Sequence, residues 1–132
     1  MALWELDGVE IAAQIKDGSI TAREVAEATL ARMDAVNPAL NAIVARDDAA
    51  ALAAADAVDA SRAAGEVLGP LAGVPVTTKV NVDQQGFATT NGLRIQKDLI
   101  ATEDNPVVAS LRRAGAPRRV AGGIDASAGT AA

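Results

Sequence analysis

Large rings are almost absent from this chain: Trp4 and Phe87 are its only aromatic residues, although half of its 132 residues are hydrophobic. Alanine supplies much of that apolar content, and it favours helices while burying little area per residue. A core must therefore be assembled from Val, Leu and Ile. Such a core is thin for an independent domain, so the composition suggests one domain that is incomplete.

Charge and missing residue types narrow the chemistry. The net charge of −5 argues against nucleic acid, because binding phosphates requires clustered positive charge. The chain contains neither cysteine nor histidine, which removes thiolate sites, the commonest metal ligand and the usual general base. We expect no metal and no cofactor, and any acid–base chemistry must use carboxylates, lysine or a partner chain. Neither a signal peptide nor a membrane-spanning run is recognised, so we expect a cytoplasmic protein that does not bind membranes.

The first half of the chain reads as helical. Asp7 predicts a cap before a helix over 8–17 that Gly18 ends, and Thr21 with Glu24 forms a capping box for the next helix. We expect Asn37-Pro38 to stop that helix. The remaining predictions are a short strand over 40–44 and a third, alanine-rich helix from Asp47 or Asp48 to about Ala64, ended by Gly65.

The pattern changes at Gly69. Residues 69–73 are rich in turn formers, and residues 74–80 are β-branched and extended, which predicts a strand. Residues 81–92 favour an ordered loop. A further helix is expected to start at Pro106, to bury Val107, Val108 and Leu111, and to end at Gly115. These elements together indicate a mixed α/β chain.

One segment carries a specific resemblance. Residues 69–92 read GPLAGVPVTTKVNVDQQGFATTNG, which resembles the segment around the first catalytic residue of the amidase-signature family. Flanking motifs extend the resemblance to about residues 5–116: REV at 23–25, NPALNA at 37–42, and DNPVVA at 104–109 with AGA at 114–116. The resemblance implies the N-terminal portion of the amidase-signature fold, a mixed sheet flanked by helices that the family builds from a chain several times longer.

By this resemblance, Lys79 is the lysine of a Ser–cis-Ser–Lys triad. Burial at a strand end would disfavour its charged form, so that a neutral amine could accept a proton, through a bridging serine, from the nucleophilic serine. Spacing alone favours a different interpretation, a solvated lysine at a sheet edge. The Thr89-Thr90 pair could line the site or fill the loop. Val80 stands where many family members have aspartate, which weakens a supporting carboxylate there.

The two serines of the triad are not recognised. The chain has Ser19, Ser61, Ser110 and Ser127, none within the family's paired-serine, glycine-rich stretch. The resemblance stops near residue 116, and the Ala-, Gly- and Arg-rich residues 117–132 are expected to be a flexible, non-family tail. We therefore expect two regions, 1–116 from an amidase domain and the tail at 117–132. The abrupt change suggests a hypothesis of a frameshift or gene rearrangement, which reading all three frames beyond codon 115 would test.

Several functions stay open from the sequence. The first is an amidase-type hydrolase of small carboxylic amides, with this chain truncated and inactive alone. An amidotransferase subunit that releases ammonia from glutamine is possible within the same family, and the motifs do not name the substrate. The second is a non-catalytic interaction fragment. Uncovered sheet edges in such a fragment would favour self-association or a partner chain, such as a complementary amidase segment.

Overall fold

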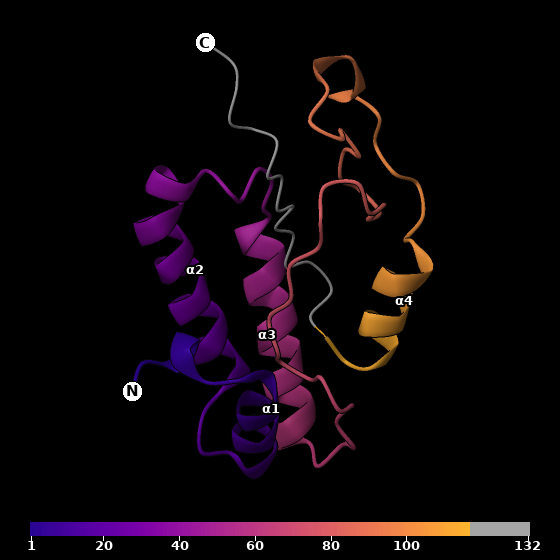
Figure 1. Ribbon diagram of the computed structural model, residues 1–132. Helices are drawn as coiled ribbons and strands as arrows, with labels where there is room; N and C mark the ends of the chain where they lie inside the picture. Colours follow the sequence, from indigo (N-terminus) through magenta and orange to yellow (C-terminus); the bar gives the residue numbers. More distant parts are fainter. Residues whose placement is uncertain (117–132) are drawn as a thin grey trace.

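In a computed structural model, residues 1–116 can be described; the predicted tail at 117–132 lies outside them. The elements in chain order are η1 (Leu3–Glu5), α1 (Gly8–Asp17), α2 (Ala22–Leu40), α3 (Asp48–Ala63), η2 (Arg94–Gln96) and α4 (Pro106–Arg113). Figure 1 shows α2 and α3 side by side, with α1 across one end of the pair and α4 on the other side of α3. No helix within residues 1–116 has the length and apolar character needed to cross a bilayer.

Local capping signals explain where the helices begin. The Asp7 carboxylate accepts hydrogen bonds from the amides of Val9 and Glu10, both at 2.8 Å, and starts α1 as predicted. Thr21 and Glu24 form the predicted capping box of α2. Asp47 caps α3 by accepting from the Ala50 amide. These caps satisfy amides that a helix start leaves without partners, so the boundaries follow from the sequence.

The N-terminus of α2 has a second, non-local cap. The Asp59 carboxylate, on α3, accepts from the amides of Ala22 at 2.8 Å and Arg23 at 3.0 Å. Its negative charge also lies at the positive end of the α2 dipole. Asp59 therefore fixes the register of the two long helices.

The core is small, as the composition suggested. Its main cluster joins α1, α2, α3 and the extended segment after residue 73, through Ile11, Ile15, Ala22, Val25, Ala55 and Val74. A second cluster between α2 and α3 contains Met33 and Ala51. Three of these eight buried residues are alanine, so α2 and α3 approach closely while burying little area.

The prediction that Asn37-Pro38 stops α2 is wrong by about one turn. The helix continues to Leu40, with Pro38 inside it, and ends at Asn41 in a left-handed conformation. The Asn37 side chain explains this, because its Oδ1 accepts from the amides of Ala42 and Ile43 while its Nδ2 donates to the Ile43 carbonyl. The side chain of Asn37, the residue before the proline, therefore closes the end of α2 beyond Pro38.

The predicted strands and mixed sheet are not found in the part of the chain that the structure describes. Leu40 belongs to α2, residues 74–80 are extended without forming a named strand, and Ala88 with Ile100 forms an isolated antiparallel bridge. Ile43 and Thr78 each form only a single-residue bridge, and neither bridge extends into a ladder within residues 1–116. The described part is helical, and the α/β prediction is not confirmed for it.

Helix α4 begins and ends as predicted, but its buried face is turned. Asn105 caps it by accepting from the Val107 amide, and Gly115 follows its end with a φ of +95°. Val108 is buried, whereas Val107 is 60% exposed, which contradicts the expected burial of Val107. The inward face is formed by Val108, Leu111 and Arg112 at i, i+3 and i+4.

Candidate functional site

The glycine-rich turn before Lys79 is held by close backbone approaches. The Leu71 amide donates to the Ala114 carbonyl at 2.8 Å, and a Cβ on Gly69 would lie 2.5 Å from that same oxygen. On the other side, Gly73 has a φ of +78° and packs against Ile15 and Ala22 of the core. The turn thus anchors the extended segment 74–80 between α4 and the helices α1 and α2.

Lys79 lies near the end of this extended segment, on the surface. Its side chain is exposed, and within residues 1–116 its ammonium group has no hydrogen-bond or ion-pair partner. The Lys79 carbonyl accepts from the Val82 amide at 2.9 Å, which closes a turn directly after it. The expected burial of Lys79 is therefore wrong for residues 1–116, among which no element covers the amine.

Apolar side chains surround a small hollow beside Lys79. Its volume is about 20 Å³, and it is lined by Ala45, Thr78, Lys79, Val80, Val82, Gln84, Phe87 and Ala88. Lys79 is the only charged residue in this lining. Such a hollow admits at most a water molecule, so it does not form a substrate pocket.

The described serines do not meet the lysine. Ser19 donates its hydroxyl to Asp17, Ser110 accepts from Arg113 at 2.9 Å, and Ser61 lies on α3. None of them lines the hollow at Lys79. Ser127 lies outside the described residues. Residues 1–116 therefore bring no serine to the predicted catalytic lysine.

The loop after Lys79 is ordered by polar side chains. Thr89 is buried and donates its hydroxyl to the Asp83 carboxylate, which favours the structural interpretation of the Thr89-Thr90 pair. The Thr78 hydroxyl donates to Oε1 of the buried Gln84 at 3.3 Å. Sequence reasoning did not identify Asp83 or Gln84 as contacts of these threonines, because no local spacing rule predicts them.

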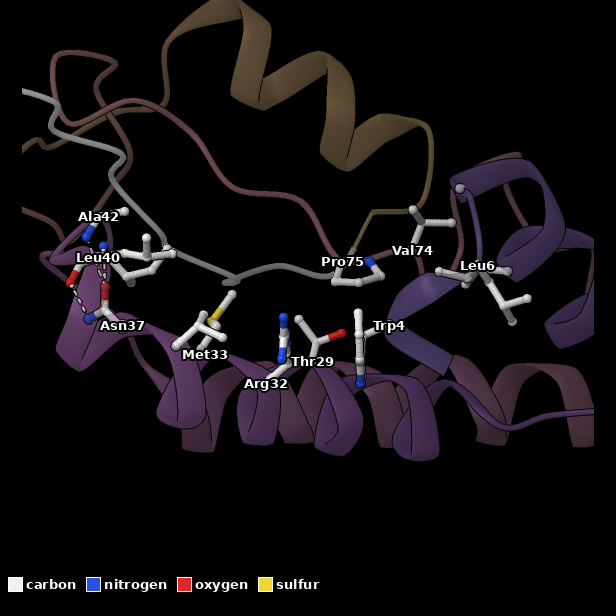
Figure 2. Close-up of a pocket in the computed structure, with 14 residues that line it drawn as sticks. Trp4, Leu6, Thr29, Arg32, Met33, Asn37, Leu40, Ala42, Val74 and Pro75 are labelled. Atoms are coloured by element: carbon white, nitrogen blue, oxygen red, sulfur yellow. Dashed lines mark hydrogen bonds between the residues drawn. The ribbon is translucent and has the colours of Figure 1, made fainter. Parts of the chain in front are cut away.

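A second feature missed from the sequence is a groove along α2, shown in Figure 2. It encloses about 380 Å³ between α2, the N-terminal segment and the extended segment at Val74 and Pro75. Most of its lining is apolar. Arg32, its only charged lining residue, places its guanidinium 4.2 Å from the ring centroid of Trp4, a cation–π contact. Among residues 1–116, no group of three or more carboxylates is placed to hold a metal ion.

Comparisons with known proteins agree with the motif. The model of the Amidase family matches residues 24–128. An indoleacetamide hydrolase from Bradyrhizobium diazoefficiens is 50% identical over 114 residues, which is 86% of this chain and 22% of that protein. A glutamyl-tRNA(Gln) amidotransferase subunit from Alkalilimnicola ehrlichii is 47% identical over 106 residues, which is 80% of this chain and 22% of that protein.

Solved structures show the same relationship in three dimensions. A bacterial aryl acylamidase of the amidase signature enzymes superimposes with a TM-score of 0.83 at 26% identity, over 89% of this chain and 25% of that one. The chain thus spans about a quarter or less of the length of these relatives. The helical arrangement of residues 1–116 is therefore one that longer, folded proteins contain.

Proposed function

This chain belongs to the amidase family, and from that premise we propose that it carries part of an amide-hydrolysing site in which Lys79 is the proton-accepting group. The reaction is hydrolysis of a carboxylic amide to an acid and ammonia or an amine. The observation that carries the proposal is the placement of Lys79, which follows the glycine-rich family motif and ends an extended segment anchored on both sides. No cofactor is needed for this chemistry.

The proposed mechanism requires a partner for the lysine. A serine hydroxyl attacks the amide carbonyl, and its proton passes through a second serine to the neutral amine of Lys79. That proton is then delivered to the amide nitrogen as the C–N bond breaks, so that ammonia or an amine leaves and an acyl-enzyme remains. Water hydrolyses the acyl ester, which releases the acid and restores the serine hydroxyl. Because Lys79 is exposed and meets no serine within residues 1–116, we propose that a complementary polypeptide segment supplies both serines. The same segment would cover Lys79 and exclude water from its amine.

The fold proposal follows the same reasoning. Residues 1–116 would be the first part of an amidase-signature domain, and the extended segment 74–80 would join a mixed sheet when strands from outside the described residues pair with it. Residues 117–132 are proposed to be a tail distinct from this domain, although the match to the Amidase family model continues to residue 128 and weighs against that boundary. We propose a cytoplasmic location and a small amide substrate, without nucleic acid or membrane as partners. The names of relatives include both an indoleacetamide hydrolase and an amidotransferase subunit, so both substrate classes belong in the test.

A non-catalytic role is the second candidate, and one observation favours it. The groove along α2 and the exposed apolar side chains of Val67, Ile95 and Val107 leave much hydrophobic surface in contact with water. Surfaces of this kind are typical of protein contacts. In this alternative the chain binds another protein, for example a complementary amidase segment, without taking part in turnover.

One experiment separates the two. The purified chain, alone and mixed with the remaining segment of an amidase-family relative that carries both serines, is assayed for ammonia release from indole-3-acetamide, glutamine and simple amides. Lys79→Met is compared with the control Lys97→Met, which replaces another exposed lysine. Turnover that Lys79→Met abolishes and Lys97→Met retains supports the hydrolase proposal. Equal turnover in both variants excludes a role for Lys79. Absence of turnover, together with a stoichiometric complex by light scattering, supports the interaction role.

A further inference from the structure

The most enclosed ion pair of residues 1–116 lies at α4. Arg112, in the last turn of the helix, donates to Oδ2 of Asp104, two residues before its first turn. Their side chains are 18% and 13% exposed, less than those of any other ion pair in the described chain. A pair removed from water in this way contributes little net stability, but loss of one partner leaves a desolvated charge. Its geometry is therefore strongly maintained.

Asp104 also holds the loop that follows Lys79. Its second carboxylate oxygen accepts from the Gln85 amide at 2.8 Å, across 19 positions of the chain. Next to it, the Asn105 amide donates to the Asp83 carbonyl at 2.8 Å. The start of α4 is thus joined to the loop at two consecutive points, and Arg112 fixes the carboxylate that makes one of them.

Gln84, between these two contacts, reaches back to the residue before Lys79. It is buried, and its Oε1 accepts from the Thr78 hydroxyl. Arg112 and these side chains line one hollow of about 10 Å³, whose full lining is Val76, Thr78, Gln84, Val108, Leu111, Arg112 and Ala116. The buried Nη2 of Arg112 has no hydrogen-bond partner within residues 1–116. Arg112 is therefore buried beside the segment that carries Lys79.

We propose that Asp104 and Arg112 are positioning residues for Lys79. The pair fixes Gln85 through the Asp104 carboxylate, and the neighbouring Asn105 amide holds Asp83. These two contacts keep Gln84 against Thr78, and the direction of the chain at Lys79 follows from that. The inference deepens the proposed function and rests on it for the meaning of Lys79. The inference requires that the ion pair stabilises the turn after Lys79. This stabilisation can be measured in a chain that shows no catalytic turnover.

The test is amide hydrogen exchange by NMR on the whole 132-residue chain. In Arg112→Met, we expect exchange of the Val82 and Gln85 amides to become about tenfold faster, because local opening then costs less. The Val25 amide, in the α2 core, should change by less than about twofold. A matched control is Arg23→Met, which removes two ion pairs, to Glu27 and Asp56, whose side chains are all at least 40% exposed; it should leave Val82 unchanged.

Rescue by a conservative variant distinguishes positioning from general destabilisation. Arg112→Lys keeps the charge beside Asp104 and should restore most of the protection at Val82, whereas Asp104→Asn should resemble Arg112→Met. The inference is overturned if exchange at Val82 is unchanged in Arg112→Met, or if all amides accelerate equally. Turnover that survives Lys79→Met would instead overturn the proposed function, and the exchange result would stand.

Discussion

Replacement of Gly73 by alanine should strongly destabilise this chain, for two separable reasons. Gly73 has a φ of +78°, a conformation that costs a residue with a Cβ about 1–2 kcal/mol. In addition, that Cβ would lie 2.5 Å from Cδ1 of Ile15 and 2.9 Å from Cβ of Ala22. Both neighbours are fully buried, so insertion of the methyl group should cost about a further 1–3 kcal/mol. The expected loss is about 2–5 kcal/mol in the free energy of unfolding.

The chain offers a control that isolates the first reason. Gly65 has a φ of +73°, but a Cβ built on it meets nothing within 4 Å. Gly65→Ala should therefore lose only the conformational part, about 1–2 kcal/mol. Urea unfolding of both variants, followed by far-ultraviolet circular dichroism, measures the difference. Equal losses in the two variants would refute the argument that the motif turn is packed tightly against α1 and α2.

Three further outcomes follow from the contacts. Asp59→Ala should lower the free energy of unfolding by about 1–2 kcal/mol, since α2 loses the acceptor of two amides; thermal unfolding measures this. Hydrogen bonds from Arg46 hold the pKa of the Asp48 carboxyl below its ordinary value of 3.8. The stability that this carboxylate contributes is therefore fully present above the pKa of the unfolded chain. It is lost as the pH falls through the lower pKa of the folded chain. Asp48→Asn should weaken that acid dependence in unfolding measured across pH. Arg32→Ala should change the fluorescence of Trp4, the only tryptophan, and cost about 0.5–1 kcal/mol.

Each outcome has a control on the same chain. Asp56→Ala removes an exposed partner of Arg23 and should cost less than Asp59→Ala, because exposed pairs contribute at most about 1 kcal/mol. Asp98→Asn changes a carboxyl that is 87% exposed, and its acid dependence should match that of the unmodified chain. Lys16→Ala, on α1, should leave Trp4 fluorescence unchanged. A control that equals its test variant would contradict the corresponding contact.

Local signals made the helices predictable from the sequence. A cap such as Asp7 or Thr21 accepts hydrogen bonds from amides two or three residues away, so all the residues involved lie within one helical turn of the sequence. The end of α2 was missed because Asn37 acts across the turn on Ala42 and Ile43. Non-local partners were not predictable by these rules. The sheet expected around 74–80 depends on strands that residues 1–116 do not provide, and no pattern in the sequence states which segments will pair.

The same distinction between local signals and non-local contacts applies to the candidate site. The position of Lys79 came from a motif, whereas its exposure depends on which elements cover it, and that is a property of the assembled fold. Asp104 was predicted only as part of a helix start. Its pairing with Arg112 spans the length of α4, and its contact with Gln85 spans 19 positions. Asp104 lies outside α4, so helical periodicity does not predict the first contact, and local spacing rules do not reach across 19 positions to predict the second.

Val80 shows how a departure from a family pattern can be reconciled with the surrounding structure. The residue is 9% exposed and borders a hollow whose other lining is mostly apolar. An aspartate in that place would need a cation to offset its desolvation, and Lys79 is the only charged residue of the lining. In this chain the ammonium of Lys79 is exposed to water, so it would offer a buried carboxylate little compensation. Valine leaves no charge to be satisfied, which makes the turn after Lys79 compatible with an uncovered lysine.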